Sequence, residues 1–145
     1  MLRTKVCNLL GIELPILAAG MGGVALSALA AAVSEAGGFG TIATAGLGAN
    51  LVAEEIASAR RLTNKPFGAG LLIPLLAPDV FACVIKEHPA AIIFFWGDVS
   101  PYVPDCRKAG IKVICQAGSV EEAVAAVRAG ADAIIAQGFE AGGHV

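Results

Sequence analysis

Three segments of the chain share one pattern of apolar and polar positions, in which an Ala-rich helical stretch is followed by Ala-Gly and then by four or five apolar residues. A glycine directly after a helix supplies the left-handed backbone angle that ends it, so we expect helices to end at Gly37, Gly110 and Gly130. The apolar run after each glycine is typical of a parallel strand that is buried on both faces. The three segments are AAAVSEAGGFGTIAT, DCRKAGIKVICQA and AVAAVRAGADAIIAQ.

The same alternation runs along the whole chain and predicts six strands separated by five helices, which is typical of a parallel α/β fold. The strands are expected at Ile16–Ala19, Gly40–Ala43, Phe67–Leu72, Ala91–Phe95, Lys112–Gln116 and Ala133–Ala136. The helices are expected at Ser27–Ala36, Leu51–Leu62, Asp79–Glu87, Pro101–Ala109 and Val120–Ala129. Ser119 is expected to cap the last helix, with the Glu122 carboxylate reaching back to the cap amide.

Two parallel architectures compete for this pattern. A doubly wound sheet needs about as many residues as the 145 present, whereas an eight-stranded barrel needs about 250. Length therefore favours the doubly wound sheet. The chemistry of the loops favours the barrel.

Ligands bind beyond the carboxyl ends of the strands in either architecture, so the loops that follow the strands are the candidate sites. Four of these loops are rich in glycine, which lets backbone N–H groups approach a ligand closely. Several such turns around one opening suit a flat, phosphorylated cofactor. The four loops comprise residues 20–23, 44–48, 116–118 and 137–144.

Composition narrows the class of partner. With 57% apolar and 15% charged residues, the chain is expected to bury one large core in a single domain. Ten basic residues face twelve acidic ones without a run of either sign, which indicates neither a nucleic-acid surface nor an acidic tail. A small-molecule ligand is the expected partner.

Two further features bear on the environment of the protein. The four cysteines, at positions 7, 83, 106 and 115, have no C-x-x-C spacing, so we interpret them as reduced thiols in a cytoplasmic protein and not as a metal site. Residues 14–34 carry no charge and reach the length of a membrane span. Gly20, Gly22 and Gly23 interrupt that stretch, which favours a strand, a turn and a helix and predicts no membrane segment.

Few side chains in these loops carry proton chemistry. His144 is the one group in the four loops that exchanges a proton near neutral pH, and two preceding glycines leave room for a ligand beside it. Glu140 is a base, a ligand or a loop charge, and Asp98 is a second acidic candidate or a helix cap. Trp96, at the end of the fourth expected strand, packs over a ring system or belongs to the core.

The terminal motif Gln137-Gly138-x-Glu140-Ala141-Gly142-Gly143-His144 resembles that of the nitronate monooxygenase family, formerly called 2-nitropropane dioxygenases. Members of this family are FMN-dependent TIM barrels, related to the flavin-containing enoyl-acyl-carrier-protein reductases. The resemblance extends over almost the whole chain. Its supporting matches are Leu9-Leu10-Gly11-Ile12, Pro15-Ile16, Gly20-Met21, Ala32-Val33-Ser34-x-Ala36-Gly37-Gly38-x-Gly40 and Leu62-Thr63-x-Lys65-Pro66-Phe67-Gly68.

The resemblance implies a role for each loop. The backbone of Met21 and Gly22 would meet the flavin ring, Gln137 would hydrogen-bond the cofactor, and Gly142 and Gly143 would lie against it. His144 matches the active-site histidine of the family. The implied reaction oxidises alkyl nitronates or nitroalkanes with O2 to a carbonyl compound and nitrite, with FMN as cofactor and no metal.

The sequence departs from the family in two places. Gly70 stands where the family usually has a flavin-binding Asn. The chain also stops just past His144, before the seventh and eighth strands whose loops hold the FMN phosphate. Residues 1–145 are therefore expected to be the N-terminal portion of an FMN-binding (β/α)8 barrel, with six strands and five helices. Its open sheet edges predict self-association, aggregation or pairing with a chain that supplies the rest.

Three alternatives remain at this stage. One is a flavin-dependent enoyl-acyl-carrier-protein reductase, which would use NADH or NADPH to reduce a double bond in a thioester. Another is a catalytically inactive half-barrel, either an interaction module or a fragment without a function. The last is a complete doubly wound protein that binds a small phosphorylated ligand.

Overall fold

The structure is a computed structural model that describes residues 3–143 of the chain. Five parallel strands form one sheet in which neighbours in space are also neighbours in the sequence, in the order β1-β2-β3-β4-β5. A doubly wound sheet reverses its strand order at a switch point, and this sheet does not. The strands are β1 (Gly40–Ala43), β2 (Phe67–Leu72), β3 (Ala91–Phe95), β4 (Lys112–Ala117) and β5 (Ala133–Ala136).

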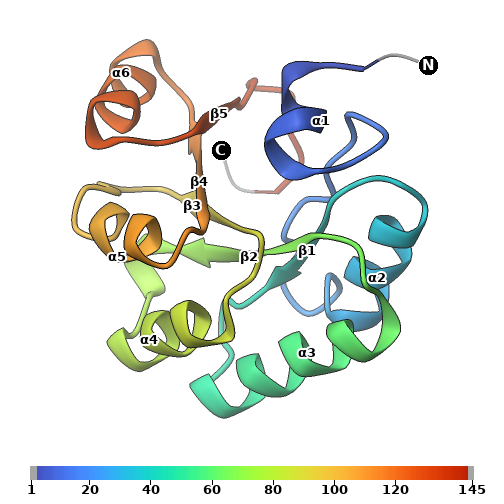
Figure 1. Cartoon of the computed structure of the whole chain (residues 1–145). Helices are drawn as coiled ribbons and strands as arrows, with labels where there is room; N and C mark the ends of the chain where they lie inside the picture. Colours follow the sequence, from blue (N-terminus) through green and yellow to red (C-terminus); the bar gives the residue numbers. More distant parts are fainter. Residues whose placement is uncertain (1–2, 144–145) are drawn as a thin grey trace.

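Helices alternate with the strands, and Figure 1 shows α2 to α6 arranged in an arc around the sheet. This order of elements is that of a (β/α) barrel that is incomplete. The helices are α1 (Lys5–Leu10), α2 (Ser27–Glu35), α3 (Ala49–Leu62), α4 (Pro78–Glu87), α5 (Val103–Lys108) and α6 (Val120–Ala129), with a 3-10 turn η1 (Ile73–Leu75) after β2.

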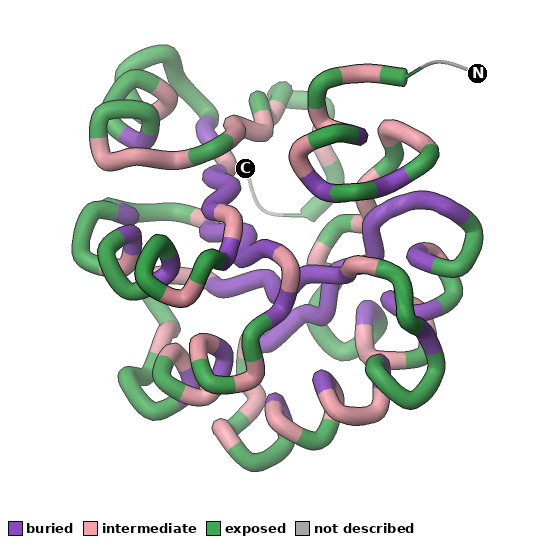
Figure 2. The backbone as a smooth tube through the Cα atoms, viewed as in Figure 1, coloured by how far each residue is buried: buried purple, intermediate pink, exposed green. Residues whose placement is uncertain are grey.

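The two faces of the sheet bury two separate apolar clusters, because successive strand residues point to opposite faces. Ile92 and Phe94 of β3 face the helices and join the larger cluster. Ile93, from the same strand, belongs to the inner cluster with Phe39 and with Cys7 of α1. Figure 2 shows β1 to β4 as the most continuously buried part of the chain, whereas β5 is only partly buried. Burial on both faces explains why these strands read as unbroken apolar runs.

The predicted helix ends are confirmed. Gly37, Gly110 and Gly130 have φ angles of +92°, +71° and +108°, which are left-handed conformations favoured by glycine. The five predicted helices are all present, with ends that lie within two residues of the prediction. Ser119 caps α6 as expected, since its hydroxyl accepts from the Glu122 amide at 3.1 Å. The predicted hydrogen bond from the Ser119 amide to the Glu122 carboxylate was wrong, because this carboxylate accepts from the Gly118 amide instead, at 2.8 Å.

The first predicted strand, Ile16–Ala19, is not a strand of the sheet. It makes an isolated parallel bridge between Leu17 and Phe39. Two hydrogen bonds hold it there, from the Ala18 amide to the Phe39 carbonyl and from the Phe39 amide to the Ile16 carbonyl, both 2.9 Å long. Further along β1 the Ala43 amide donates to Ala25 instead, which stops the ladder from growing.

The chain also contains two elements that the pattern did not predict, namely α1 and η1. Within residues 3–143, no helix combines the length and the apolar character that crossing a membrane requires.

Candidate functional site

A cleft of about 640 Å³ opens at the carboxyl ends of the strands. This volume lies in the range of about 300–1,000 Å³ that is usual for small-molecule and cofactor sites. The cleft brings together loops that are more than a hundred residues apart in the sequence. Its lining residues are Ala19, Gly20, Met21, Gly22, Ala45, Leu72, Phe95, Trp96, Gln116, Gln137, Gly142 and Gly143.

The five residues predicted to bind a cofactor all line this one cleft. Met21 and Gly22 approach it from the loop before α2, and Gln137 follows the last residue of β5. Gly142 and Gly143 close it from the end of the described chain. His144, the predicted catalytic residue, lies outside the described residues. The structure therefore gathers the predicted ring-binding set and leaves the histidine untested.

The glycines leave open space above the cleft walls. A Cβ atom added to Gly22 or Gly142 would meet no atom within 4 Å. Gly20 differs, because its Cβ would lie 3.7 Å from the Thr41 side chain beneath it. The hydroxyl of Thr41 is fully buried and has no hydrogen-bond partner in the structure. Two open glycine walls with an apolar floor between them fit a flat ring system.

Gly70 lies against an aromatic ring on the inner face of the sheet. A Cβ at this position would lie 3.3 Å from the ring of Phe95, on the inner face of the sheet. Phe95 also lines the cleft. The floor of the cleft is therefore apolar near Gly70, where the resemblance had implied a flavin-binding Asn.

Two glutamines supply the polar side chains of the cleft. Gln116 and Gln137 come from the carboxyl ends of β4 and β5, and the other lining residues are glycine, alanine or larger apolar side chains. No charged side chain occurs among the lining residues in the part of the chain that the structure describes. Such a site orients a ligand by hydrogen bonds and excludes water by its apolar walls.

The sequence predictions did not assign roles to Gln116 or Phe95. A signal for both was present, because alternation along a buried strand places each on the same face as Ile114 or Ile93. The inner face at a carboxyl end is where a barrel presents side chains to a ligand. For Trp96 the sequence left two interpretations, packing over a ring system or a place in the core. Trp96 lines the cleft and is 41% exposed.

The remaining candidate side chains do not enter the cleft. Asp98 accepts hydrogen bonds from the amide and hydroxyl of Ser100, which hold the pKa of Asp98 below its ordinary value. Asp98 does not cap α5, whose first residue is Val103. His88 ends α4 on the exposed surface, and the exposed Glu140 is absent from the cleft lining.

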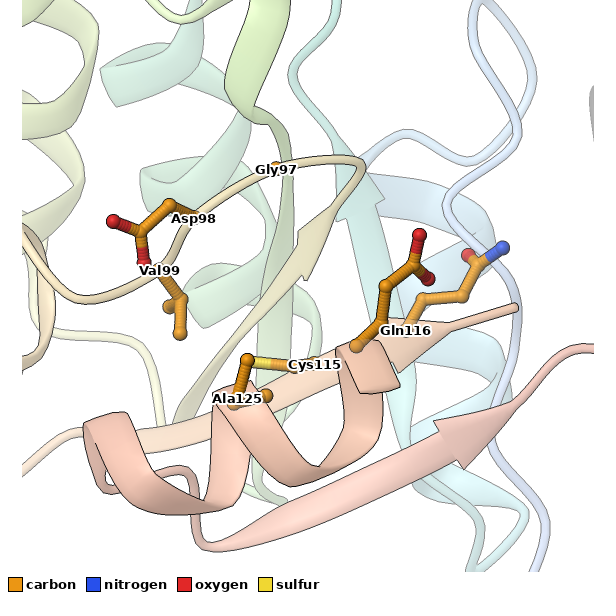
Figure 3. Close-up of a pocket in the computed structure, with 8 residues that line it drawn as sticks. Gly97, Asp98, Val99, Cys115, Gln116 and Ala125 are labelled. Carbon is orange, nitrogen blue, oxygen red and sulfur yellow. The ribbon is translucent and has the colours of Figure 1, made fainter. Parts of the chain in front are cut away.

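A second pocket of about 280 Å³ lies on the helix side of β4 (Figure 3). Cys115 points from β4 toward α6 there, whereas the Gln116 side chain points away from that helix. Burial raises the pKa of the Cys115 thiol to about 11, so the thiol stays protonated and unreactive at neutral pH. The nearby Glu122 carboxylate is already hydrogen-bonded to Gly118. This pocket holds no group prepared for catalysis.

All four cysteines are free thiols, at positions 7, 83, 106 and 115. Within residues 3–143, no three metal-ligating side chains of the His, Cys, Asp and Glu types come together. The described part of the cleft therefore offers hydrogen bonds, glycine backbone and apolar surface to a ligand.

The fold and the cleft define a class of protein, the parallel (β/α) barrels of the TIM type with a site at the carboxyl ends of the strands. The sequence model of the nitronate monooxygenase family matches residues 3–81 and 79–145, so the chain belongs to that family. FabK from Thermotoga maritima has the same arrangement, with a TM-score of 0.95 and 39% identity, over 100% of this chain and 47% of that chain.

Two curated relatives differ in how they align. Nitronate monooxygenase from Pseudomonas aeruginosa is 37% identical over 97% of this chain and 51% of its own length. A Mycobacterium tuberculosis protein is 35% identical over 99% of this chain and 41% of its own length, and is named as a dehydrogenase of an octahydro-indene carboxyl-CoA. The chain thus spans about half the length of the curated relatives that it matches.

The alignments with these two relatives differ in length. The alignment with the Pseudomonas enzyme runs over 180 positions, which exceeds the 145 residues of this chain by 35. The Mycobacterium alignment runs over only 144 positions. The two matches to the family model meet at residues 79–81, at the start of α4. The Pseudomonas alignment therefore contains positions to which no residue of this chain corresponds, and the Mycobacterium alignment does not.

Proposed function

We propose that this chain supplies the ring-binding part of an FMN-dependent oxidoreductase site. The observation that carries the proposal is the convergence of Met21, Gly22, Gln137, Gly142 and Gly143 on one cleft. The nitronate monooxygenase family, to which the chain belongs, is generally flavin-dependent. Bound FMN would supply electron transfer between an organic substrate and a second acceptor.

Each lining group has a proposed task in holding the ring. The open backbone at Gly22 and Gly142 permits close approach of a flat face, because no Cβ stands between the chain and the ligand. The amide of Gln137 would hydrogen-bond the cofactor, and Gln116 would offer a second amide from the neighbouring strand β4. The apolar floor at Phe95 keeps water from the face of the ring.

The proposed reaction is the oxidation of alkyl nitronates or nitroalkanes with O2 to a carbonyl compound and nitrite. Its support is membership of the family and the similarity to the Pseudomonas nitronate monooxygenase. His144 is the proposed general base, which takes the proton from the carbon next to the nitro group. The small-molecule substrate and O2 are the proposed partners.

A second candidate reaction is the reduction of an enoyl thioester by NADH or NADPH. The Mycobacterium relative favours it, because that protein is named as a dehydrogenase of a carboxyl-CoA and aligns with this chain without the additional positions of the Pseudomonas alignment. FabK is an enoyl-acyl-carrier-protein reductase, and its high structural similarity to the whole of this chain also favours the reductase.

One pair of assays separates these candidates. The chain, saturated with FMN, is given a nitroalkane in air without nicotinamide, and separately an enoyl thioester with NADH. Nitrite formation in the first assay supports the oxygenase. Consumption of NADH that depends on the thioester, without nitrite in the first assay, contradicts it and supports the reductase.

Matched variants show whether either activity belongs to the cleft. Gln137→Ala removes a lining amide and is expected to lower the activity, whereas Gly118→Ala changes an exposed loop residue outside the cleft lining and is the control. Flavin that binds without either activity would support the inactive half-barrel.

A further inference from the structure

The backbone takes an uncommon conformation at the end of β3. Trp96 has a φ angle of +56°, and His88 is the other non-glycine residue with a positive φ in residues 3–143. His88 has an ordinary explanation, since it ends α4 in the left-handed conformation. Trp96 ends no helix. A bulky residue in this region of φ is strained, and such strain is concentrated at functional sites.

The conformation changes the side of the sheet on which Trp96 lies. Alternation along β3 places Ile92 and Phe94 against the helices, so a regular continuation would send Trp96 there as well. Phe94 packs in that layer against Tyr102, with ring centroids 5.4 Å apart. Trp96 instead lines the cleft together with its neighbour Phe95. The strained turn thus puts two consecutive aromatic residues on the ligand side.

The following residue holds the turn in place. Gly97 has a φ angle of +145°, and a Cβ at this position would lie 2.9 Å from the Ile73 side chain of η1. Glycine is the residue that fits both the conformation and this close contact. The turn is therefore built into the packing of the loop after β3 against the loop after β2.

We propose that Trp96 contacts the ring of the bound flavin and forms an aromatic wall of its site. The inference rests on the proposed flavin site, and it adds a cofactor contact from the loop after β3. An indole that is 41% exposed at an apolar cleft presents a large flat surface, which is suited to a planar aromatic ligand. The glycine walls of the same cleft leave space for that ligand.

The contact has a spectroscopic signature, because the chain contains a single tryptophan. Indole in van der Waals contact quenches flavin emission by electron transfer, and a phenyl ring does not. FMN is titrated into the full chain and into Trp96→Phe, with anisotropy reporting binding and the emission lifetime reporting contact. We expect bound flavin in Trp96→Phe to have a severalfold longer lifetime than in the unchanged chain.

Two further variants control the experiment. Tyr102→Phe removes another aromatic quencher, but Tyr102 packs against Phe81 and Phe94 on the helix side and should leave the lifetime unchanged. Trp96→Gly accepts the left-handed conformation, so it keeps the fold while removing the indole. It should also lengthen the lifetime.

The outcomes separate the two claims. Bound flavin with the same lifetime in the unchanged chain and in Trp96→Phe would overturn the contact and leave the flavin site standing. The absence of an anisotropy change in the folded unchanged chain would overturn the flavin site, and the Trp96 contact with it.

Discussion

At the scale of single residues, the glycines of the cleft differ from those that shape the fold. Gly40 lies directly under α2, and a Cβ there would overlap the Ala30 carbonyl, so this glycine serves packing. Gly142 meets no atom within 4 Å and has no positive φ, so neither space nor conformation requires glycine. The proposed ligand explains the glycine at position 142, because a bound ring would need the space that a side chain would occupy.

Replacement of Gly142 by alanine therefore separates binding from stability. We expect Gly142→Ala to weaken FMN binding about tenfold, equivalent to about 1.4 kcal/mol, because the methyl group enters the space of the ring. The midpoint of urea unfolding should not change. Isothermal titration with FMN and urea denaturation followed by circular dichroism measure the two quantities.

The control for this substitution is Gly118→Ala. Gly118 is exposed, does not line the cleft, and would meet only the Glu122 carboxylate at 3.7 Å, an ordinary contact distance. It should retain the FMN affinity of the unchanged chain. Equal affinities for Gly142→Ala and Gly118→Ala would contradict the assigned role of Gly142.

The thiols give a second prediction at this scale. Burial raises the pKa of Cys106 to about 12 and that of Cys115 to about 11, so the thiolate fraction at pH 8 is very small for both. Cys83 is only partly buried. A disulfide reagent at pH 8 should therefore modify Cys83 much faster than Cys106 and Cys115, as peptide mass spectrometry would measure.

The order of modification depends on the folded structure. In urea the rates of the cysteines should converge, because unfolding removes the burial that protects Cys106 and Cys115. Rapid modification of Cys115 in the folded chain would contradict the packing of β4 against α6.

At the scale of elements, the cap of α6 is a local interaction that the sequence predicted, and its Ser119 hydrogen bond is confirmed. We expect Ser119→Ala to lower the free energy of unfolding by about 1 kcal/mol, because the Glu122 amide loses its acceptor. Urea denaturation measures the change. Ser119→Asp keeps an acceptor at the cap and should stay close to the unchanged chain, and a loss as large as that of Ser119→Ala would contradict the capping role.

Sequence pattern predicted the sheet well because its strands are short apolar runs, of which β1 to β4 are largely buried. Gly40–Ala43, Phe67–Leu72, Ala91–Phe95 and Ala133–Ala136 were predicted with the bounds that the structure has. A short apolar run between the end of a helix and a loop leaves few alternatives. The same signal failed at Ile16–Ala19, where the Ala25 carbonyl takes an amide of β1 and stops the ladder.

Other elements carried no pattern to read. The six residues of α1 are too few to show a helical period, and no side chain caps its start. Its helical state follows from tertiary packing, in which Cys7 and Leu10 cover the inner face of the sheet. The local sequence does not predict burial that depends on residues far away in the chain.

The candidate site was predictable to the extent that its loops follow strands. Glycine-rich turns and the terminal motif pointed to Met21, Gly22 and Gln137, which the structure brings to one cleft. The place of Trp96 in the cleft lining was not predictable, because it depends on a left-handed backbone conformation at the end of β3. No residue type in the local sequence demands that turn at tryptophan.

At the scale of the whole molecule, the sheet has open edges. Within residues 3–143, β5 pairs with β4 alone, and beyond β1 the sheet continues only as the isolated bridge of Leu17. On α6, Val120, Val124 and Val127 are 75%, 42% and 58% exposed and follow a helical spacing that places them on one face. Unpaired edges and exposed apolar faces promote association.

We therefore expect the purified chain to self-associate. Sedimentation velocity should give species heavier than the 14.6 kDa of one chain, and a dye that binds apolar surface should fluoresce with it. A double variant, Val120→Lys with Val127→Glu, should reduce dye binding, because it breaks the apolar face of α6. A monodisperse 14.6 kDa species without dye binding would contradict this expectation.

The central claim is that the cleft at the carboxyl ends of the strands binds FMN, and a titration of FMN into the purified chain tests it most directly. Flavin anisotropy is followed in the unchanged chain, in Gln137→Ala and in Gly118→Ala. The account predicts saturable binding that weakens in Gln137→Ala and persists in Gly118→Ala. A folded chain that leaves the anisotropy of FMN unchanged, or binding that is equal in all three proteins, would contradict it.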